Sequence, residues 1–186
     1  MKDKEFISNY LNRYQKSLFE LDVSDEIIKL KYMLLNIKES KNKVIIAGNG
    51  GSAAMASHVA VDFTKQGKIK TINFNEPDLI TCFANDYGYE NWISRAIDFY
   101  GEQGDLVILI SSSGNSKNIL NAADTAKNLG IDVVTFSGFL KTNPLRKKGI
   151  LNFWLDSKAY NIVENTHLIW LLMTCDLIIG DAEYSA

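Results

Sequence analysis

The sequence predicts an α/β protein in which helices cover both faces of a parallel β-sheet. From residue 43 onward, short apolar runs alternate with stretches of helical periodicity. Strands that alternate with helices of this length are joined by crossovers, so the sheet is expected to be parallel. The 186 residues suffice for one well-buried domain and are too few for two comfortable ones. We therefore expect a single domain over 1–186, with a helical pair in 1–40 and the α/β core with its C-terminal helix in 41–186.

Two amphipathic helices are predicted at the N-terminus. Apolar side chains recur at three- and four-residue steps within 6–21, and again within 27–37. Ser24 precedes the second set and is followed by Asp25 and Glu26, the acidic residues that favour a first helical turn. We expect Ser24 to be the N-cap of the second helix.

The core elements then follow along the chain. Strands are predicted at 44–47, 106–110, 132–136 and 151–155, with a short one near 70–73. Helices are predicted at 52–65 and 116–129, in one or two pieces between 78 and 100, and finally at 159–179. The last helix contains the apolar run Leu-Ile-Trp-Leu-Leu-Met at 168–173, which leaves it no polar face. Such a helix must be buried, either in the domain or between subunits.

Two polar turns carry most of the functional information. Gly-Asn-Gly-Gly-Ser at 48–52 follows the first apolar run of the core, and Ser-Ser-Ser-Gly-Asn-Ser at 111–116 follows the run at 106–110. A strand that turns through glycines and hydroxyls into a helix directs backbone N–H groups and a positive dipole end at one point. Two such turns in one small domain predict a phosphorylated ligand held from two sides.

Charge and cysteine content exclude several classes of protein. The 20 basic and 22 acidic residues are interspersed and give a net charge of -2, so the basic stripe of a nucleic-acid-binding protein is missing. Residues 1–5 lack the apolar region of a signal peptide, and no apolar run has the length of a membrane span, so we expect a cytoplasmic protein. Cys82 and Cys175 lack metal-ligand spacing and are expected to be buried free thiols.

Three polar motifs occur in a fixed order along the core. They are Gly-Asn-Gly-Gly-Ser-Ala-Ala at 48–54 followed by His58, Asn-Asp-Tyr-Gly-Tyr-Glu at 85–90 followed by Ser-Arg at 94–95, and Ser-Ser-Gly-Asn-Ser at 112–116 followed by Asn-Ile at 118–119. Together they resemble the sugar isomerase (SIS) domain, and most of all the phosphoheptose isomerases, from about residue 43 to the C-terminus.

This resemblance implies a fold, an assembly and an activity. The fold would be a flavodoxin-like three-layer sandwich around a five-stranded parallel sheet, preceded by the two N-terminal helices. The assembly would be a homotetramer with sites at subunit interfaces. The activity would be an aldose–ketose isomerisation between sedoheptulose 7-phosphate and a glycero-manno-heptose 7-phosphate, or a related sugar phosphate, in surface-polysaccharide precursor synthesis. No nucleotide cofactor is implied.

The resemblance also assigns substrate-binding residues, each with a physical reason. The second turn would hold the phosphate at a helix N-terminus, where a dianion is stabilised, through Ser111, Ser112, Ser113 and Ser116. The first turn would lie along the sugar, since glycine permits close backbone approach, through Asn49, Gly50, Gly51 and Ser52. Asn85 and Asp86 would bind sugar hydroxyls, although the same residues alone would suggest an ordinary turn.

The catalytic positions are where this chain departs from the family pattern. Moving a proton between C1 and C2 through an enediol needs a base, and an acid or metal to stabilise charge on oxygen. In the phosphoheptose isomerases a His and a Glu four residues apart, with a Gln and a His eight apart on the last helix, can together bind zinc. The matching residues here are His58, Asp62, Glu164 and Leu172. The family's acid or fourth ligand is therefore missing.

Three interpretations of this loss remain open. First, His167 lies three residues after Glu164 and can take over the lost role, which would allow a zinc site of His58, Asp62, Glu164 and His167. Second, the chemistry is metal-free, with Asp62 or Glu164 as the base in a partly desolvated pocket. Third, catalysis is lost and the protein binds a phosphosugar as a regulator or assembly factor. The candidate catalytic residues are thus Asp62, Glu164 and His167, and the candidate zinc ligands are His58, Asp62 and Glu164.

Overall fold

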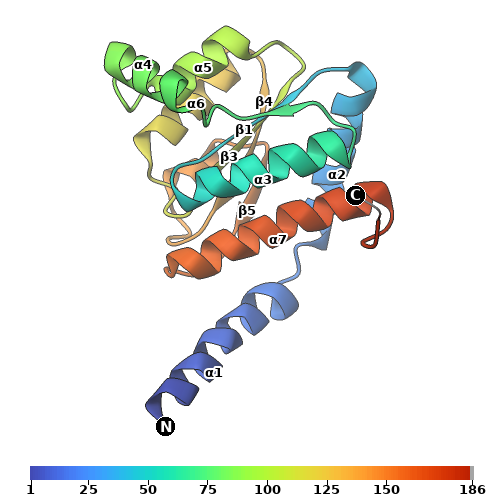
Figure 1. The fold of residues 1–186 in the computed structure, drawn as a ribbon, viewed down its shortest axis with the longest axis vertical. Coiled ribbons are helices and arrows are strands. Elements are labelled where there is room, and N and C mark those ends of the chain that lie inside the picture. Colours follow the sequence, from blue (N-terminus) through green and yellow to red (C-terminus); the bar gives the residue numbers. More distant parts are fainter. Residues whose placement is uncertain (185–186) are drawn as a thin grey trace.

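A five-stranded parallel sheet forms the centre of the protein in a computed structural model that describes residues 1–184 (Figure 1). The strands are β1 Val44–Ala47, β2 Thr71–Ile72, β3 Leu106–Ser111, β4 Asp132–Ser137 and β5 Leu151–Trp154. Their order is β2-β1-β3-β4-β5, and every neighbouring pair is parallel. This is the flavodoxin-like order, so the predicted fold class is confirmed. The second strand is shorter than expected, because only Val44 and Ile45 of β1 pair with it.

Helices cover the sheet on both faces and complete three layers. The covering helices are α2 Ser24–Ser40, α3 Gly51–Lys65, α4 Pro77–Tyr87, α5 Trp92–Tyr100, α6 Lys117–Asn128 and α7 Tyr160–Ile179. Helix α1 Lys2–Gln15 lies outside these layers, and the chain also has a π-helical turn at Lys16–Glu20 and a 3-10 turn at Pro144–Lys147. One buried cluster joins α2, α3 and α7 to one face of the sheet. A second cluster joins α5 and α6 to the other face, and α4 packs at its margin.

The starts of β1 and β3 are aligned by a buried carboxylate. Asp105 is almost fully buried and accepts backbone N–H groups from Lys43 (3.0 Å) and Glu102 (2.8 Å). The Lys43 ammonium lies 2.7 Å from the same carboxylate. Because an unpaired buried charge is costly, these partners hold the two strands in register. In that register Ala47 pairs with Leu109, so both strands end at the same edge of the sheet.

Helix α7 is long and apolar enough to cross a membrane, by length and composition alone, in contrast to our expectation that no segment has this property. Core helices of soluble proteins pass the same test. Eight residues of α7 are buried, and the helix packs against α2 and α3. Its apolar character is therefore explained in large part by its place in the core, as predicted from the run at 168–173.

Helix α1 extends away from the sandwich and buries none of its residues (Figure 1). It joins the core at the π-helical turn, where Ser17 is buried and accepts a hydrogen bond from Thr166 of α7 (3.2 Å). Asn165 of α7 also donates to the hydroxyl of Tyr14 (2.8 Å). The exposed apolar side chains of α1 include Phe6 and Leu11. Isolated helices of this length are marginal in water, so packing must stabilise α1.

Two local predictions are wrong. Ser24 is the first residue of α2, not its N-cap: Val23 occupies the cap position, and the Asp22 carboxylate accepts the Ser24 N–H at 2.9 Å. Cys82 is exposed on α4, because the apolar pattern around it faces only the margin of the core, whereas Cys175 is buried as expected. Both thiols are free.

Candidate functional site

The two polar turns lie side by side at the carboxyl edge of the sheet, because β1 and β3 are neighbours. The chain leaves β1 toward α3 on one face and leaves β3 toward α6 on the other. This reversal is the topological switch point, where open α/β sheets bind ligands. A cavity of about 130 Å³ lies there, lined by Asn49, Ser52, Ile110, Ser111, Ser112, Ser113, Ser116, Tyr160 and Glu164.

The second turn gathers hydroxyl groups at the N-terminus of α6. Ser116 is the N-cap residue, and its hydroxyl accepts a hydrogen bond from Ser111 (3.2 Å). The Ser113 hydroxyl accepts the Asn115 N–H (3.2 Å). Gly114 has a φ of +67°, and a side chain at this position would collide with Asn143. The tight turn that brings the hydroxyls together therefore requires glycine. All four predicted serines line the cavity, which is the geometry needed to hold a phosphate.

Among residues 1–184, Glu164 of α7 is the only one with an ionisable carboxyl group that lines this cavity. Ser112 donates to it at 3.5 Å. Its carboxylate lies against the first turn of α3 so closely that a Cβ on Gly51 would overlap it. Burial raises the pKa of Glu164, and the hydrogen bond from Ser112 opposes that shift. A carboxyl group with a raised pKa beside an anion site is chemically suited to proton transfer.

A second, open hollow of about 410 Å³ adjoins the cavity and shares Asn49 and Ser116 with it. Its other lining residues are Tyr89, Glu90, Lys117 and Asn118. The cavity and the hollow together offer adjacent spaces for a phosphate and for the chain of a sugar. Sequence reasoning gave no role to Tyr89, Asn118 or Tyr160. The first two stand inside or beside the quoted motifs, whereas no local pattern identifies Tyr160.

His58 and Asp62 are paired on α3, with 3.2 Å between Nε2 and a carboxylate oxygen, and their side chains are 54% and 24% exposed. Helices α3 and α7 lie side by side (Figure 1). Gly51 of α3 lies opposite Glu164 of α7. Further along the same two helices, Asp62 lies near Cys175, because burial and then the Asp62 charge raise the pKa of the Cys175 thiol to about 11. Asp62 follows Gly51 by eleven residues on α3, as Cys175 follows Glu164 on α7, and eleven residues span about 16 Å along a helix. Within one chain, the predicted base thus lies well away from the cavity.

His167 is the clearest correction to the sequence prediction. Its side chain is fully buried between Phe136 and Trp170, and Nε2 lies 3.1 Å from the carbonyl oxygen of Ser137. Burial lowers its pKa to about 4. Sequence spacing placed His167 one turn from Glu164, but residues three apart on a helix differ in direction by about 60°, enough to turn one into the core. His167 is a neutral core residue and does not reach the cavity.

The zinc ligands are not brought together within one chain. Among residues 1–184, no group of three His, Cys, Asp or Glu side chains is arranged to hold a metal ion. His58 and Asp62 are adjacent, Glu164 lies at the other end of the α3–α7 pair, and Leu172 packs against the core. A tetrahedral zinc site needs four ligands, or three and an open position. The donor set of a single chain therefore does not fit zinc.

Asn85 and Asp86 form the last turn of α4, where both are exposed. Asn85 donates to the Asp86 carboxylate at 2.9 Å. Neither residue lines the cavity or the hollow beside it. Within one chain, α4 thus places both residues at its exposed end, outside the two spaces that the site offers to a ligand.

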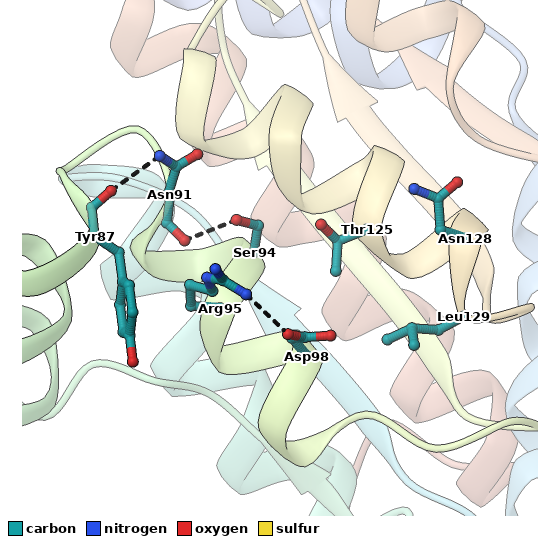
Figure 2. A pocket seen from close by; sticks show the side chains of 8 residues that line it. All are labelled: Tyr87, Asn91, Ser94, Arg95, Asp98, Thr125, Asn128 and Leu129. Atoms are coloured by element: carbon teal, nitrogen blue, oxygen red, sulfur yellow. Dashed lines mark hydrogen bonds and ion pairs between the residues drawn. The ribbon is translucent and has the colours of Figure 1, made fainter.

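A further polar hollow, of about 420 Å³, lies between α5 and α6 (Figure 2). It contains Arg95, whose guanidinium group stacks over the Tyr87 ring and donates to Asp98 at 3.1 Å. Ser94 and Asn91 also line it, and their side chains donate to backbone carbonyl oxygens of Asn91 and Tyr87, respectively. None of the predicted site residues contributes to this hollow. The charge of its arginine is already compensated, so we assign it no part in the site.

Fold and cavity together define an α/β protein with a serine-lined cavity at the switch point of a parallel sheet, where proteins of this class bind ligands. The family model for the SIS domain matches residues 8–138. The phosphoheptose isomerase of Fusobacterium nucleatum is 34% identical over 175 residues, covering 89% of this chain and 89% of that protein. That of Helicobacter pylori (strain P12) is 33% identical over 184 residues, covering 94% and 92%.

The chain therefore belongs to the SIS domain family and, within it, to the family of the phosphoheptose isomerases. The fold agrees with solved structures of two such proteins. The phosphoheptose isomerase from Francisella tularensis superimposes with a TM-score of 0.89 at 21% identity, covering 97% of this chain and 100% of that one. GmhA from Neisseria gonorrhoeae superimposes with a TM-score of 0.86 at 23% identity, covering 94% and 98%.

Proposed function

We propose that this protein interconverts sedoheptulose 7-phosphate and a glycero-manno-heptose 7-phosphate, as a sugar-phosphate isomerase in the synthesis of surface-polysaccharide precursors. The observation that carries the proposal is the serine-lined cavity at the N-terminus of α6, in a chain 34% identical to a phosphoheptose isomerase. The cavity suits the phosphate, and the adjoining hollow suits the sugar chain.

The base and the phosphate site come from different copies of the chain in this proposal. Asp62 is about 16 Å from the cavity of its own chain, too far to reach C1 and C2 of a bound sugar. Exposed apolar side chains favour association: Phe6, Ile7 and Leu11 on α1, and Ile169, Met173 and Leu177 on α7. We propose a homotetramer in which Asp62, oriented by His58, enters the site of a neighbouring copy. Asn85 and Asp86 would reach the sugar in the same way.

The proton transfer assigns a role to each carboxyl group. Asp62 would remove the proton from C2 of the aldose and return it to C1 of the resulting enediol, which gives the ketose. Glu164, with its raised pKa, would donate a proton to O1 as the enediol forms and would take the proton of the C2 hydroxyl back as the ketose carbonyl forms, so that both carboxyl groups return to their starting states. Zinc remains a prediction, because a zinc ion would need donors from a second copy, and no step here depends on it. A cytoplasmic location likewise remains a prediction.

Solvent exchange provides the test of this function. The purified protein is incubated with sedoheptulose 7-phosphate in deuterated water, with and without added zinc, and deuterium incorporation at C1 and C2 is followed by NMR. Exchange and formation of the aldose are expected. Measurable ligand binding without exchange under either condition would contradict the proposed activity on this substrate. Metal analysis of protein purified without chelator provides the parallel test for zinc.

Replacing two serines should weaken substrate binding. In the double variant Ser113→Ala with Ser116→Ala, the ligand phosphate loses two hydroxyl donors, each worth roughly 1.5–3 kcal/mol when the partner is charged. We expect the Kd for sedoheptulose 7-phosphate, measured by calorimetry, to rise at least about 100-fold. Ser94→Ala is the matched control, because Ser94 lies in the other hollow. Unchanged affinity in the double variant would place the phosphate elsewhere.

The Glu164→Gln variant should bind the phosphosugar more tightly while turning it over more slowly. A carboxylate in the same small cavity repels the phosphate, and removing one charge at this range is worth about 1–2 kcal/mol, a roughly ten-fold gain in affinity. Because burial raises the pKa of Glu164, part of this gain should appear in the wild type as the pH falls and the carboxyl group takes up a proton. Calorimetry from pH 8 to pH 5.5 measures both effects. Weaker binding by the variant would mean that the carboxylate contacts the ligand favourably.

A non-catalytic phosphosugar-binding protein is the second candidate function. Leu172 favours it, because this position holds a side chain that packs against the core and can neither transfer a proton nor bind a metal. On this alternative the serine-lined cavity would still bind a sugar phosphate, and the protein would act as a regulator or assembly factor. Binding without solvent exchange is the result that selects it.

A further inference from the structure

A network of polar side chains joins the two turns of the site. Asn49 of the first turn and Asn118 of α6 exchange two hydrogen bonds, from each amide nitrogen to the other amide oxygen, at 2.9 and 2.8 Å. The Tyr89 hydroxyl donates to the same Asn49 oxygen at 3.1 Å. Asn118 is 3% exposed, whereas Asn49 lines both the cavity and the adjoining hollow. Asn49 therefore borders both the cavity and the space offered to the sugar chain.

The backbone determines which way both amides face. The Ile119 N–H donates to Oδ1 of Asn118 at 3.0 Å, which identifies the oxygen end of that side chain. Nδ2 of Asn118 must then face Asn49, and it requires an acceptor there. Oδ1 of Asn49 is consequently directed at Asn118 and Tyr89, and the orientation of the whole pair follows from one backbone N–H group.

The remaining hydrogen-bonding capacity of Asn49 is a donor. An amide oxygen has two lone pairs, and those of Asn49 are taken by Asn118 and Tyr89. The amide nitrogen has two N–H groups, and Asn118 accepts one. One N–H is left for a ligand. Asn49 can thus donate a hydrogen bond to an oxygen of the ligand, but it cannot accept a hydrogen bond from a ligand hydroxyl group.

We propose that Asn118 and Tyr89 are positioning residues that make Asn49 a pure hydrogen-bond donor toward an anionic or carbonyl oxygen of the bound sugar phosphate. This inference rests on the proposed function. Enediol formation places negative charge on a substrate oxygen next to the carbon that loses its proton. A fixed N–H group stabilises such charge without reorganisation, whereas a freely rotating amide presents its own oxygen half of the time.

Turnover kinetics of single and combined variants test the inference. Removal of one fixed donor to an oxyanion lowers kcat by about 100- to 1,000-fold. We expect Asn49→Ala to approach this loss, Asn118→Ala to lower kcat by about 10- to 100-fold and Tyr89→Phe by about 3- to 10-fold, each with a smaller change in KM. If both residues act through Asn49, neither substitution lowers kcat further in the Asn49→Ala background. Asn128→Ala, exposed near the end of the same helix, is the matched control and keeps the wild-type kcat.

The outcomes separate the inference from the proposed function. An active wild type with unchanged kcat in both variants, or with losses that add to that of Asn49→Ala, overturns the positioning roles and leaves the isomerase intact. An inactive wild type overturns the function instead. The side-chain amide signal of Asn49 in a 15N NMR spectrum then tests the geometry. Sedoheptulose 7-phosphate should shift one of its two protons in the wild type and shift neither selectively in Asn118→Ala. A wild-type signal that does not respond overturns the inference.

Discussion

The Asp62→Asn variant is expected to lose turnover almost completely while it still binds sedoheptulose 7-phosphate. Asparagine has the shape of aspartate but cannot accept a proton, and a general base contributes about 100- to 10,000-fold to a rate. The serines that would hold the phosphate are unchanged in this variant. We expect kcat, measured by NMR of the two sugars, to fall by at least about 100-fold, and the calorimetric Kd to change by less than about three-fold.

The matched control is Asp98→Asn, which removes a carboxylate that is likewise paired with a basic side chain, on α5. It should turn over at the wild-type rate. Full activity of Asp62→Asn would transfer the role of base to Glu164 and contradict the proton path proposed above.

Mixing two inactive variants tests whether sites are shared between copies. Asp62→Asn retains its serines, and the double variant Ser113→Ala with Ser116→Ala retains its base. If base and phosphate site come from different copies, a mixed oligomer contains some complete sites, about a quarter of the total for pairwise random mixing. Activity should therefore reappear after the two variants are unfolded together and refolded. No recovery, with oligomers shown to be mixed, would contradict the shared site.

Folding stability should decrease by about 3 kcal/mol between pH 7 and pH 4 because of His167 alone. Its pKa is lowered from 6.5 to about 4 in the folded state by burial. Between these two pKa values the unfolded chain binds a proton at His167 that the folded chain does not bind, so acid favours unfolding. The contribution is fully present above the unfolded pKa and is lost as the pH falls from about 6.5 toward 4, at about 1.4 kcal/mol per pH unit.

Urea unfolding of the wild type and His167→Gln at several pH values measures this loss. Glutamine keeps a donor for the Ser137 carbonyl oxygen but does not titrate. The variant should be less stable at pH 7.5 and should lose about 3 kcal/mol less than the wild type on acidification to pH 4. If the free energy of unfolding depended on pH in the same way in the wild type and in His167→Gln, protonation of His167 would not reduce folding stability, which would contradict this prediction.

The predicted and observed elements agree closely in the core, and the disagreements have local causes. The apolar runs at 44–47 and 106–110 predicted β1 and β3 because both strands are buried on both faces and show no alternation. The prediction at 70–73 was too long, since β2 has a strand partner on one side only. The Ser24 cap prediction failed because α2 begins at Ser24 itself, with Val23 in the cap position and the Ser24 N–H bonded to the Asp22 carboxylate.

Some predictions about the site agree with the structure, and others do not. The serines of 111–116 line one cavity together with Asn49 and Ser52 of the first turn, as the prediction of a ligand held from two sides implied. His58 and Asp62 are paired, as the four-residue spacing implied. His167 was misplaced because helical spacing describes which residues share a face, whereas packing decides which face meets the core.

The sequence by itself determined the class of fold, the two anion-type turns and the membership in the phosphoheptose isomerase family, because these properties depend on local patterns of apolar, glycine and hydroxyl residues. Only the tertiary structure decided what each polar group can do. It directed His167 into the core and Glu164 into the serine-lined cavity, and it separated Asp62 from that cavity along α3. It also brought Asn118 against Asn49 across 69 residues of sequence. Burial, charge environment and hydrogen-bond partners are properties of packing between distant segments, and the reactivity of a side chain depends on them.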